Sequence, residues 1–318
     1  MQMELKVGSL FSGIGGIDLG FLKAGFNVSW AIENDAACCR TYRHSFGDIN
    51  LIEKDIRFVE PSQLDHIDVL IAGFPCQAFS VGGLQRGFDD CRGNLFFEIT
   101  KFVEYNKPRF VFLENVPNLI EHDSGRTFNH IHNAFSELNY TIRYRVMRAS
   151  EYGAIPQIRD RIYIVAFRED RDCEKFSFPE EIERVISIED ILQRNVQKHN
   201  VYYYDIEDPF YSKVNNIVFR KDSIYRVYHE SIKITQNQMC PTLTASMGTR
   251  PNQVHLVIDD FGIRRLTLRE CLDFQGFPNN FYFPNTITIN DAYKQIGNSV
   301  CVPVVERIAK NIKLLRDK

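Results

Sequence analysis

Short apolar segments that alternate with amphipathic ones impose the strongest constraint on how the first half of this chain folds. Four apolar segments have the length of buried strands, and they occupy residues 5–10, 28–32, 68–72 and 110–113. Helical spacing follows the first of them, where Ile17, Phe21 and Ala24 share one face. Parallel strands need crossover connections, which are usually helices, so this order predicts an α/β fold built on a parallel sheet.

The alternation is lost over residues 169–263. We therefore expect one larger domain made of residues 1–168 and 264–318, interrupted by a smaller, irregular domain at 169–263. The last helix is expected to start near Pro303, and one of its faces is apolar throughout: Val304, Val305, Ile308, Ala309, Ile312 and Leu315. That face needs an apolar partner, which we expect the larger domain to provide.

The overall charge and composition exclude several classes of protein. Lys and Arg number 38 and Asp and Glu number 41, so the net charge of −3 excludes a chain that is basic throughout, although it leaves room for a local basic groove. No apolar run reaches the ~18 residues of a membrane-spanning helix, and residues 1–10 lack the apolar core of a secretion signal. We expect a cytoplasmic monomer with no membrane association.

Eight cysteines are present, at positions 38, 39, 76, 91, 173, 240, 271 and 301. None forms a CxxC pair or has zinc-like spacing to histidine, so we expect neither a metal site nor a disulfide framework. Most of them are expected to be small buried side chains, and Trp30 is expected to belong to the core as well.

The loop FSGIGG, residues 11–16, follows the first predicted strand and opens the first predicted helix. Glycines at such a place let the backbone approach a ligand and leave helix N–H groups available. Glu33 comes about 20 residues after this loop, at the end of the second strand, where an acid can bind ribose hydroxyls. The pair predicts an adenosine-containing cofactor, either NAD or S-adenosylmethionine, although the loop alone could be a plain tight turn and Glu33 a solvated strand end.

Cys76 follows the predicted strand at 68–72 closely, within the sequence GFPCQAFS. Ligands bind beyond the carboxyl ends of strands in such sheets, so Cys76 is a candidate nucleophile, although most single cysteines are structural. The stretch 81–94 after it contains four glycines and is interpreted as a mobile lid. Glu114 ends the next strand at the same edge, where it is either a catalytic carboxyl group or a strand-end cap.

Taken together and in order, these segments resemble the DNA cytosine-5 methyltransferases, especially the compact bacterial enzymes of restriction–modification systems. The motifs that carry the resemblance are FSGIGG at Phe11, ENDA at Glu33, DI at Asp55, GFPCQAFS at Gly73, GNLFFE at Gly93, ENV at Glu114, QIRDR at Gln157, RRLTLREC at Arg264, QGFP at Gln275 and QIGNSVCVP at Gln295. Each motif alone is weak, whereas the ordered set is specific. It implies a Rossmann-like S-adenosylmethionine-dependent methyltransferase sheet, with a target-recognition domain inserted at 169–263.

The resemblance assigns catalytic roles to Cys76, Glu114, Arg159 and Arg161. The Cys76 thiolate would add to C6 of a cytosine flipped out of double-stranded DNA, which enables C5 to accept the methyl group of S-adenosylmethionine. Glu114 would hold the N3 and amino edge of the ring, and Arg161 its O2. Arg159 would support Gln157 or the lid.

For the cofactor, the resemblance implies a pocket formed by Phe11, Gly13, Gly15, Glu33, Asp55, Ile56, Leu95, Asn298 and Ser299. Phe11 would lie against the adenine, Glu33 on the ribose and Asp55 at the adenine edge. Asn34 departs from the family, because some relatives have an aromatic residue at this position. Lys54 departs too, because a glycine is common there.

For DNA, the resemblance implies contacts from Ser80, Gln85, Arg86, Gln157, Thr242, Thr244 and Arg250. Thr242 or Thr244 would contact phosphate. Arg250 would either read guanine in the major groove or contact phosphate, and both alternatives stay open. A restriction endonuclease that acts on the same site is a further implied partner.

Three other functions compete with this one. An RNA cytosine-5 methyltransferase on the same scaffold would use the same catalytic residues, but the long insert favours readout of duplex DNA. An NAD-dependent oxidoreductase would leave Cys76, Glu114 and Arg161 unexplained. A catalytically inactive DNA-binding regulator would have no need of the intact Pro75-Cys76 and Glu114-Asn115 pairs.

Overall fold

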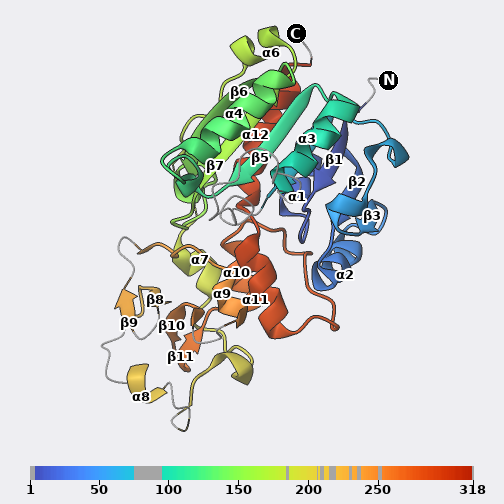
Figure 1. The fold of residues 1–318 in the computed structure, drawn as a ribbon. Coiled ribbons are helices and arrows are strands. Elements are labelled where there is room, and N and C mark those ends of the chain that lie inside the picture. Colours follow the sequence, from blue (N-terminus) through green and yellow to red (C-terminus); the bar gives the residue numbers. More distant parts are fainter. Residues whose placement is uncertain are drawn as a thin grey trace. The chain divides into compact units, whose positions relative to one another are not determined.

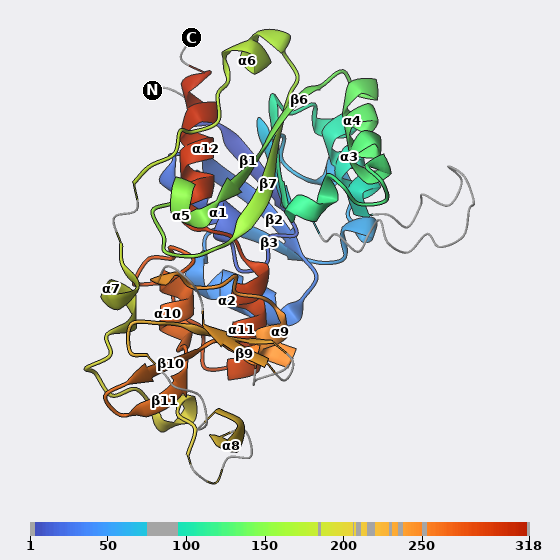
Figure 2. The same ribbon diagram turned by 90° about the vertical axis from the view of Figure 1, so that its left-hand side faces the viewer.

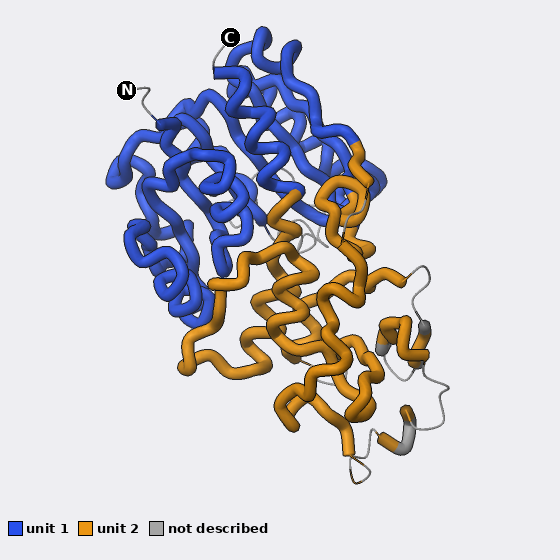
Figure 3. Tube along the Cα trace, turned by 180° about the vertical axis from the view of Figure 1, so that it is seen from behind, with its two compact units in different colours: residues 1–147, 160–180, 304–318 blue, residues 148–159, 181–303 orange. Residues whose placement is uncertain are grey.

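The computed structural model describes residues 4–74, 95–183, 186–205, 207, 211–214, 220–228, 231–234, 238–249 and 253–316 (Figure 1). The chain forms two compact units (Figure 3). Unit 1 comprises Met1–Met147, Asp160–Glu180 and Val304–Lys318, and unit 2 comprises Arg148–Arg159 and Glu181–Pro303. The predicted domains, 1–168 with 264–318 and 169–263, have other bounds than these two units, and that division stays a prediction.

Unit 1 is built on a seven-stranded sheet in the order β3-β2-β1-β4-β5-β7-β6. Its strands are β1 (Lys6–Leu10), β2 (Asn27–Glu33), β3 (Asn50–Glu53), β4 (Val69–Gly73), β5 (Phe110–Asn115), β6 (Thr141–Arg148) and β7 (Asp160–Phe167). Parallel pairing joins β3, β2, β1, β4 and β5 in that order. The α/β fold that the alternating segments predict is therefore confirmed.

Strand β7 departs from the predicted parallel sheet. It pairs antiparallel with β5, so that Phe110 lies opposite Phe167 and Asn115 lies opposite Ile162. The connection that precedes it, residues 149–159, is shorter than the crossover of about a dozen residues or more that a parallel strand requires. The sheet is consequently mixed, with β7 inserted between β5 and the edge strand β6.

Helices cover both faces of this sheet (Figure 2). One side carries α1 (Gly16–Lys23) and α12 (Val302–Leu314), and the other carries α3 (Leu95–Asn106) and α4 (Arg126–Glu137). Two further helices of this unit are α2 (Ala36–Ser45) and α6 (Asp170–Lys175). Buried side chains from the sheet, α3 and α4 form one apolar cluster, and its aromatic members include Trp30, Phe96, Phe102, Phe128 and Phe135.

Trp30 belongs to the core, as predicted. It is 1% exposed, and its indole N–H donates to the carbonyl oxygen of Asp65 at 2.9 Å. The ring lies over Gly8 on the neighbouring strand, where a Cβ would come within 2.3 Å of it. Only a residue without a side chain fits there.

The apolar face predicted on the last helix is buried throughout, and its partner is α1. The two helices approach closely at Gly20, where a Cβ would lie 2.6 Å from Cγ1 of Val305. At the end of α1, Lys313 donates its Nζ to the carbonyl oxygens of Ala24 and Gly25 at 3.1 and 2.8 Å. The last helix thus completes unit 1, which confirms the prediction that the first part of the chain covers it.

Unit 2 contains a four-stranded antiparallel sheet in the order β11-β10-β8-β9. Its strands are β8 (Tyr225–Tyr228), β9 (Ser231–Ile234), β10 (Leu256–Asp259) and β11 (Gly262–Arg265). Its helices are α5 (Ala149–Tyr152), α7 (Ile188–Leu192), α8 (Tyr211–Val214), α9 (Ser246–Thr249), α10 (Leu268–Asp273) and α11 (Ile289–Asn298). Antiparallel strands need no crossover helices, which explains why the sequence of this region lacks the alternation of unit 1.

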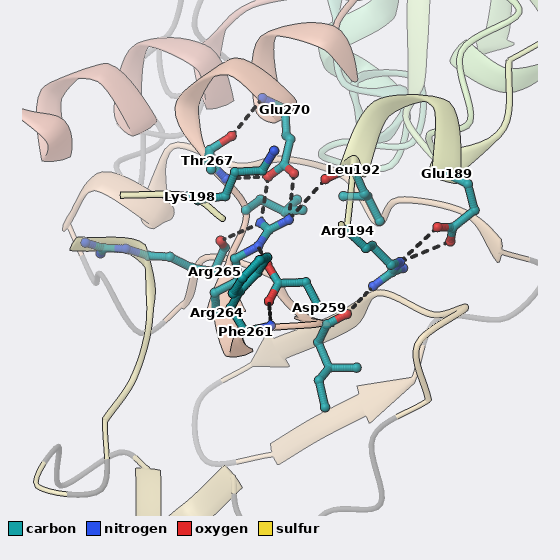
Figure 4. A network of polar contacts seen from close by, with 12 residues as sticks. Glu189, Leu192, Arg194, Lys198, Asp259, Phe261, Arg264, Arg265, Thr267 and Glu270 are labelled. Atoms are coloured by element: carbon teal, nitrogen blue, oxygen red, sulfur yellow. Dashed lines mark hydrogen bonds and ion pairs between the residues drawn. The ribbon is translucent and has the colours of Figure 1, made fainter. Parts of the chain in front are cut away.

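A buried ion-pair network joins β10, β11 and α10 in unit 2 (Figure 4). The Arg264 guanidinium is fully buried and donates through Nη1 and Nη2 to both carboxylate oxygens of Glu270, at 2.8 Å each. Its Nε donates to Oδ2 of Asp259 at 2.5 Å, and Nη2 also donates to the carbonyl oxygen of Leu192. Glu270 in turn accepts the backbone N–H of Thr267, which caps α10. One cation therefore fixes the strands against the helix.

The described cysteines agree with the prediction that most are small buried side chains. All six are free, Cys38 is half-buried, and the buried ones are Cys39, Cys173, Cys240, Cys271 and Cys301. Burial raises the pKa of the Cys39 thiol to about 12. Across the described ranges, no helix has the length and apolarity to cross a membrane, and no three His, Cys, Asp or Glu side chains gather as a metal site would require.

We predict that Arg264→Met lowers the free energy of unfolding by about 3–5 kcal/mol, because it leaves two buried carboxylates without their cation. Urea unfolding followed by circular dichroism measures this loss. Arg220→Met is the matched control, since Arg220 is 64% exposed in its ion pair with Asp222 and should contribute no more than about 1 kcal/mol. Equal effects of the two substitutions would contradict the structural role of Arg264.

Candidate active site

The carboxyl ends of four strands meet at one edge of the sheet in unit 1. The pairing places Leu10 opposite both Ile32 and Ala72, and Gly73 opposite Glu114. The residues that follow β1, β2, β4 and β5 therefore come together at this edge, where α/β sheets bind their ligands. Most of the predicted site residues of unit 1 belong to these strand ends.

The glycine loop between β1 and α1 takes up left-handed backbone conformations. The φ angles of Phe11, Gly13 and Gly15 are 53°, 56° and 81°. A Cβ at Gly13 would have no atom within 4 Å, so the loop borders open space there. A Cβ at Gly15 would instead lie 2.3 Å from the ring of Phe46. The loop thus turns tightly against α2 on one side and leaves its backbone free for a ligand on the other.

The carboxylate of Glu33, at the end of β2, holds this loop in place. Its Oε2 accepts the backbone N–H of Gly13 at 2.8 Å. Its Oε1 accepts the backbone N–H groups of Asn34 at 2.9 Å and Asp35 at 2.8 Å. The predicted pairing of the glycine loop with Glu33 is therefore a direct contact. A bond from Glu33 to a ribose hydroxyl stays a prediction.

Four further residues of the predicted cofactor pocket belong to unit 1. Phe11 and Leu95 are partly exposed and pack on the core cluster that contains Ile56. Asp55 begins a short helical turn and accepts the backbone N–H of Arg57. The hydrogen bond from the Arg57 side chain keeps the pKa of the Asp55 carboxyl below its usual value. The open space at Gly13 fits the approach of a ligand to the loop backbone, and the contacts of these four residues with a cofactor stay predictions.

Glu114 and Arg161 form an ion pair at the ends of β5 and β7. The Arg161 Nε lies 3.0 Å from Oε1 of Glu114, and the side chains are 14% and 11% exposed. The other carboxylate oxygen, Oε2, would lie 3.7 Å from a Cβ built at Gly73. An acid and a guanidinium predicted to act on one ring thus lie in contact, although they are 47 positions apart in the chain.

Asn115 is a positioning residue, which the sequence analysis named only as the partner of Glu114 in the ENV motif and gave no role of its own. Its Nδ2 donates to the carbonyl oxygen of Phe74 at 2.9 Å, and its Oδ1 accepts the backbone N–H of Val116 at 2.8 Å. Phe74 comes two residues before Cys76. Asn115 therefore fixes the point from which the chain departs toward the predicted nucleophile.

Several predicted residues cannot be placed, because they lie outside the described part of the chain. They are the nucleophile Cys76 and four of the predicted DNA contacts, Ser80, Gln85, Arg86 and Arg250. Their roles stay predictions from the sequence.

Gln157 and Arg159 are buried in unit 2, where both join distant segments. The Gln157 amide donates to the carbonyl oxygen of Phe274 and accepts the backbone N–H of Leu243. The Arg159 guanidinium donates to the carbonyl oxygens of Leu243, at 2.7 Å, and of Gly297 and Ser299. These contacts make both side chains positioning groups within unit 2. This geometry does not favour direct contact of Gln157 with DNA, which stays a prediction.

The segment of Asn298 and Ser299 packs against the segment of Thr242 and Thr244. A Cβ at Gly297 would lie 2.1 Å from the carbonyl carbon of Thr244, so the two backbones touch. Asn298 is exposed, while Ser299 is buried. Unit 2 thus brings one predicted cofactor segment and one predicted DNA segment into direct contact.

The hydroxyl groups of the two threonines have partners inside the chain. Thr242 donates to the carbonyl oxygen of Ile158 at 2.5 Å, and Thr244 shares a 2.7 Å hydrogen bond with Ser246. Both threonines are partly exposed. Their contact with DNA phosphate stays a prediction.

Comparison with known proteins shows the family to which this chain belongs. The family described as C-5 cytosine-specific DNA methylase matches residues 5–314. The Type II methyltransferase M.Bsp6I of Bacillus sp. (strain RFL6) is 43% identical over 312 residues, which are 97% of this chain and 98% of that protein. The Type II methyltransferase M.HhaI of Haemophilus parahaemolyticus is 35% identical over 320 residues, 97% of this chain and 94% of its own.

Solved structures share the fold. A mutant of Spodoptera frugiperda DNMT2 matches 98% of this chain and 100% of its own with a TM-score of 0.76 at 18% identity. The S. pombe Dnmt2 methyltransferase matches 99% of each chain with a TM-score of 0.73 at 20% identity.

The family match spans nearly the whole sequence, and relatives at 43% and 35% identity are Type II methyltransferases. This chain belongs to the C-5 cytosine-specific DNA methylases, the S-adenosylmethionine-dependent enzymes of the Type II restriction–modification kind.

Proposed function

We propose that this chain methylates C5 of a cytosine flipped out of double-stranded DNA, within a short specific sequence, through a transient covalent bond between Cys76 and C6. The observation that carries the proposal is the Glu114–Arg161 ion pair at the end of β5. It lies beside β4, the strand from which the chain runs to Cys76. A cytosine presents N3, an amino group and O2 along one edge, and a carboxyl group next to a guanidinium complements that edge.

The protein makes an unreactive ring carbon nucleophilic. The Cys76 thiolate forms a bond to C6, and the electron pair of the C5–C6 double bond moves toward C5 and the N3–O2 side of the ring. Glu114 at N3 and Arg161 at O2 share the charge that develops there. Bound S-adenosylmethionine supplies an electrophilic methyl group to C5. Loss of the C5 proton to solvent then restores the C5–C6 double bond, and the electron pair of the C6–S bond returns to Cys76 as the thiolate leaves.

Two side chains support this mechanism, because they hold the backbone of the candidate site in place. Asn115 holds the backbone at Phe74, so the start of the Cys76 loop is anchored to the strand that carries Glu114. Glu33 holds the glycine loop, whose backbone is expected to face the cofactor. Such preorganisation lowers the cost of assembling three reacting partners.

We further propose that the methylated sequence is protected from a cognate restriction endonuclease. The test is to map 5-methylcytosine in DNA from cells that express this chain alone, and to assay purified enzyme on double-stranded DNA and on tRNA. Methylation at one short DNA sequence is expected. Methylation of tRNA without methylation of DNA would overturn the proposal in favour of an RNA substrate.

We predict that Cys76→Ala lowers the methylation rate to below about 1% of the original rate, because the covalent route is lost. Binding of S-adenosylmethionine should stay nearly unchanged, because the groups predicted to hold the cofactor are the glycine loop and Glu33, and Cys76 is not among them. Cys38→Ala is the control, because Cys38 is a half-buried free thiol on α2 and should keep full activity. Residual turnover of the Cys76 variant above a few per cent would contradict covalent catalysis.

A DNA duplex with 5-fluorocytosine at the target traps the intermediate, because fluorine cannot leave as a proton does. The enzyme should then remain bonded to the DNA through denaturing electrophoresis. Peptide mapping should place the bond on Cys76. A bond at any other residue would refute the assignment.

We predict that Glu114→Gln reduces the methylation rate far more than it reduces DNA affinity. Gln keeps the shape of the side chain but lacks the carboxyl group that can share a proton with the cytosine ring. Single-turnover kinetics and a DNA-binding assay separate the two effects. Glu104→Gln, an exposed change on α3, is the matched control. Equal losses of rate and affinity would mean that Glu114 mainly positions DNA.

We also predict that sequence specificity resides in residues 169–263, because base-reading side chains must enter a groove, whereas the catalytic pocket meets only one flipped cytosine. If Arg250 reads guanine, Arg250→Ala should cost about 1–3 kcal/mol and relax preference at one position. If it contacts phosphate, binding should weaken evenly and the salt dependence should become shallower. Methylation rates on the mapped site and its single-base variants distinguish these results. Unchanged specificity after exchange of 169–263 for a relative's segment would contradict the prediction.

A further inference from the structure

The small sheet of unit 2 has two unlike faces, because successive residues of a strand point to opposite sides. One face is apolar. Tyr225, Leu256 and Ile263 are buried on it, and the partly buried Ile232 and Ile258 pack against the same cluster. The register of the antiparallel pairs places all five of these residues on one side. This face belongs to the core of unit 2.

The opposite face is charged, and it is covered over only part of its width. Over β10 and β11 it carries Asp259 and Arg264, which the buried network with Glu270 of α10 encloses (Figure 4). Over β8 and β9 it carries Arg226 and Lys233, which are both exposed. The exposed part of the charged face therefore lies on the hairpin that ends in the edge strand β9.

Two like charges face each other on this hairpin. The pairing of β8 with β9 places Arg226 directly opposite Lys233. Directly opposite side chains have Cβ atoms about 4.5–5.5 Å apart, and like charges in this arrangement destabilise a sheet. An anionic partner that lies over both cations would remove this cost.

The carboxylates described around this sheet already have cations of their own. Asp222 pairs with Arg220 at 2.8 Å, and Asp260 pairs with Lys221 at 2.6 Å. Asp259 belongs to the buried network. The net charge of the whole chain is −3, so an exposed pair of cations on one face is a local feature and can attract an anion there.

The two cations form a row with His255, which directly precedes β10. Leu256 lies opposite Tyr225, so the next position of the antiparallel register places His255 across from Arg226. Nε2 of His255 donates to the carbonyl oxygen of Thr242 at 3.3 Å. Burial lowers the pKa of His255 to about 4, and the positive charge of Arg226 lowers it further, so the ring that holds this carbonyl group is neutral.

This row leads to a segment for which DNA contact is predicted independently. Neighbouring strands lie ~4.8 Å apart, so two such steps across the sheet separate Lys233 from His255. His255 in turn contacts the segment of Thr242 and Thr244, where the sequence predicts a phosphate contact. The exposed cations therefore continue, on one face, from that segment.

We propose that Arg226 and Lys233 bind phosphate groups of the DNA duplex, independently of its base sequence. The inference rests on the proposed function, in which duplex DNA is the substrate. Phosphate charges recur at every nucleotide, ~3.4 Å apart along the axis of each strand, so adjacent cations meet anions at any sequence. A base edge suits such cations chiefly at guanine. The region predicted to read bases thus also contains contacts that position the DNA without reading it.

Anisotropy titrations at several salt concentrations test this inference, with one fluorescent duplex that contains the mapped site and one unrelated duplex. Arg226→Gln and Lys233→Gln should each weaken binding of both duplexes about five- to tenfold near 0.1 M salt. Each should also make the slope of log affinity against log salt shallower by ~0.9, and the double variant by ~1.8. Arg226→Lys keeps the charge and should keep the slope.

Lys221→Gln is the matched control, because it removes one exposed positive charge that Asp260 already neutralises, and its slope should equal that of the unmodified protein. Unchanged slopes for the Arg226 and Lys233 variants, or an equal change for the control, would overturn the inference and leave the two cations as protection of an edge strand. A loss confined to the mapped duplex would overturn it in favour of base reading. Absence of duplex methylation by the unmodified protein would instead overturn the proposed function, whatever the slopes.

Discussion

Backbone N–H groups of Gly13, Asn34 and Asp35 converge on the carboxylate of Glu33, and the geometry of the candidate site depends on this interaction. Gly13 and Gly15 adopt left-handed conformations without strain, whereas the same conformation at Phe11 persists only where neighbouring groups hold it. Glu33 ends β2 and holds the loop that follows β1, so it fixes the ends of two adjacent strands at once. The same carboxylate is expected to meet the cofactor ribose. The Glu33 side chain would then both hold the loop and bind the cofactor.

Two buried arginines have a comparable role in unit 2. Arg159 donates to carbonyl oxygens from two distant segments, and Arg264 joins two carboxylates and a carbonyl group. Buried carbonyl groups need donors, and short helices with a small sheet leave many of them without backbone partners. A guanidinium presents five N–H donors in one plane, so a single side chain can serve several of them. In unit 2, arginine side chains therefore provide hydrogen-bond donors for buried carbonyl groups, whereas in unit 1 the backbone N–H groups of the sheet provide them.

The sequence predicted the α/β class, the parallel strands and the pairing of Glu33 with the glycine loop, because apolar periodicity and strand ends are local features. It predicted a parallel sheet where β7 runs antiparallel, because strand direction depends on connections that the pattern does not reveal. It left NAD and S-adenosylmethionine as alternatives, and the family match decides for the second. The sequence could not show that Gln157 and Arg159 are buried. Their hydrogen-bond partners are backbone groups about 80 to 140 residues away in the chain. Local sequence patterns do not reveal contacts over such separations.

Arg159 and Arg161 are two positions apart, but they belong to different units. The boundary between the units falls between Arg159 and Asp160, so the chain passes from one to the other within a single residue. Arg159 is fixed by the segments predicted to bind DNA and cofactor, and Arg161 meets Glu114 in unit 1. Each arginine can be described within its own unit. Arg159 serves carbonyl groups inside unit 2 and has no need to touch the cytosine, whereas Arg161 lies beside the candidate catalytic acid of unit 1.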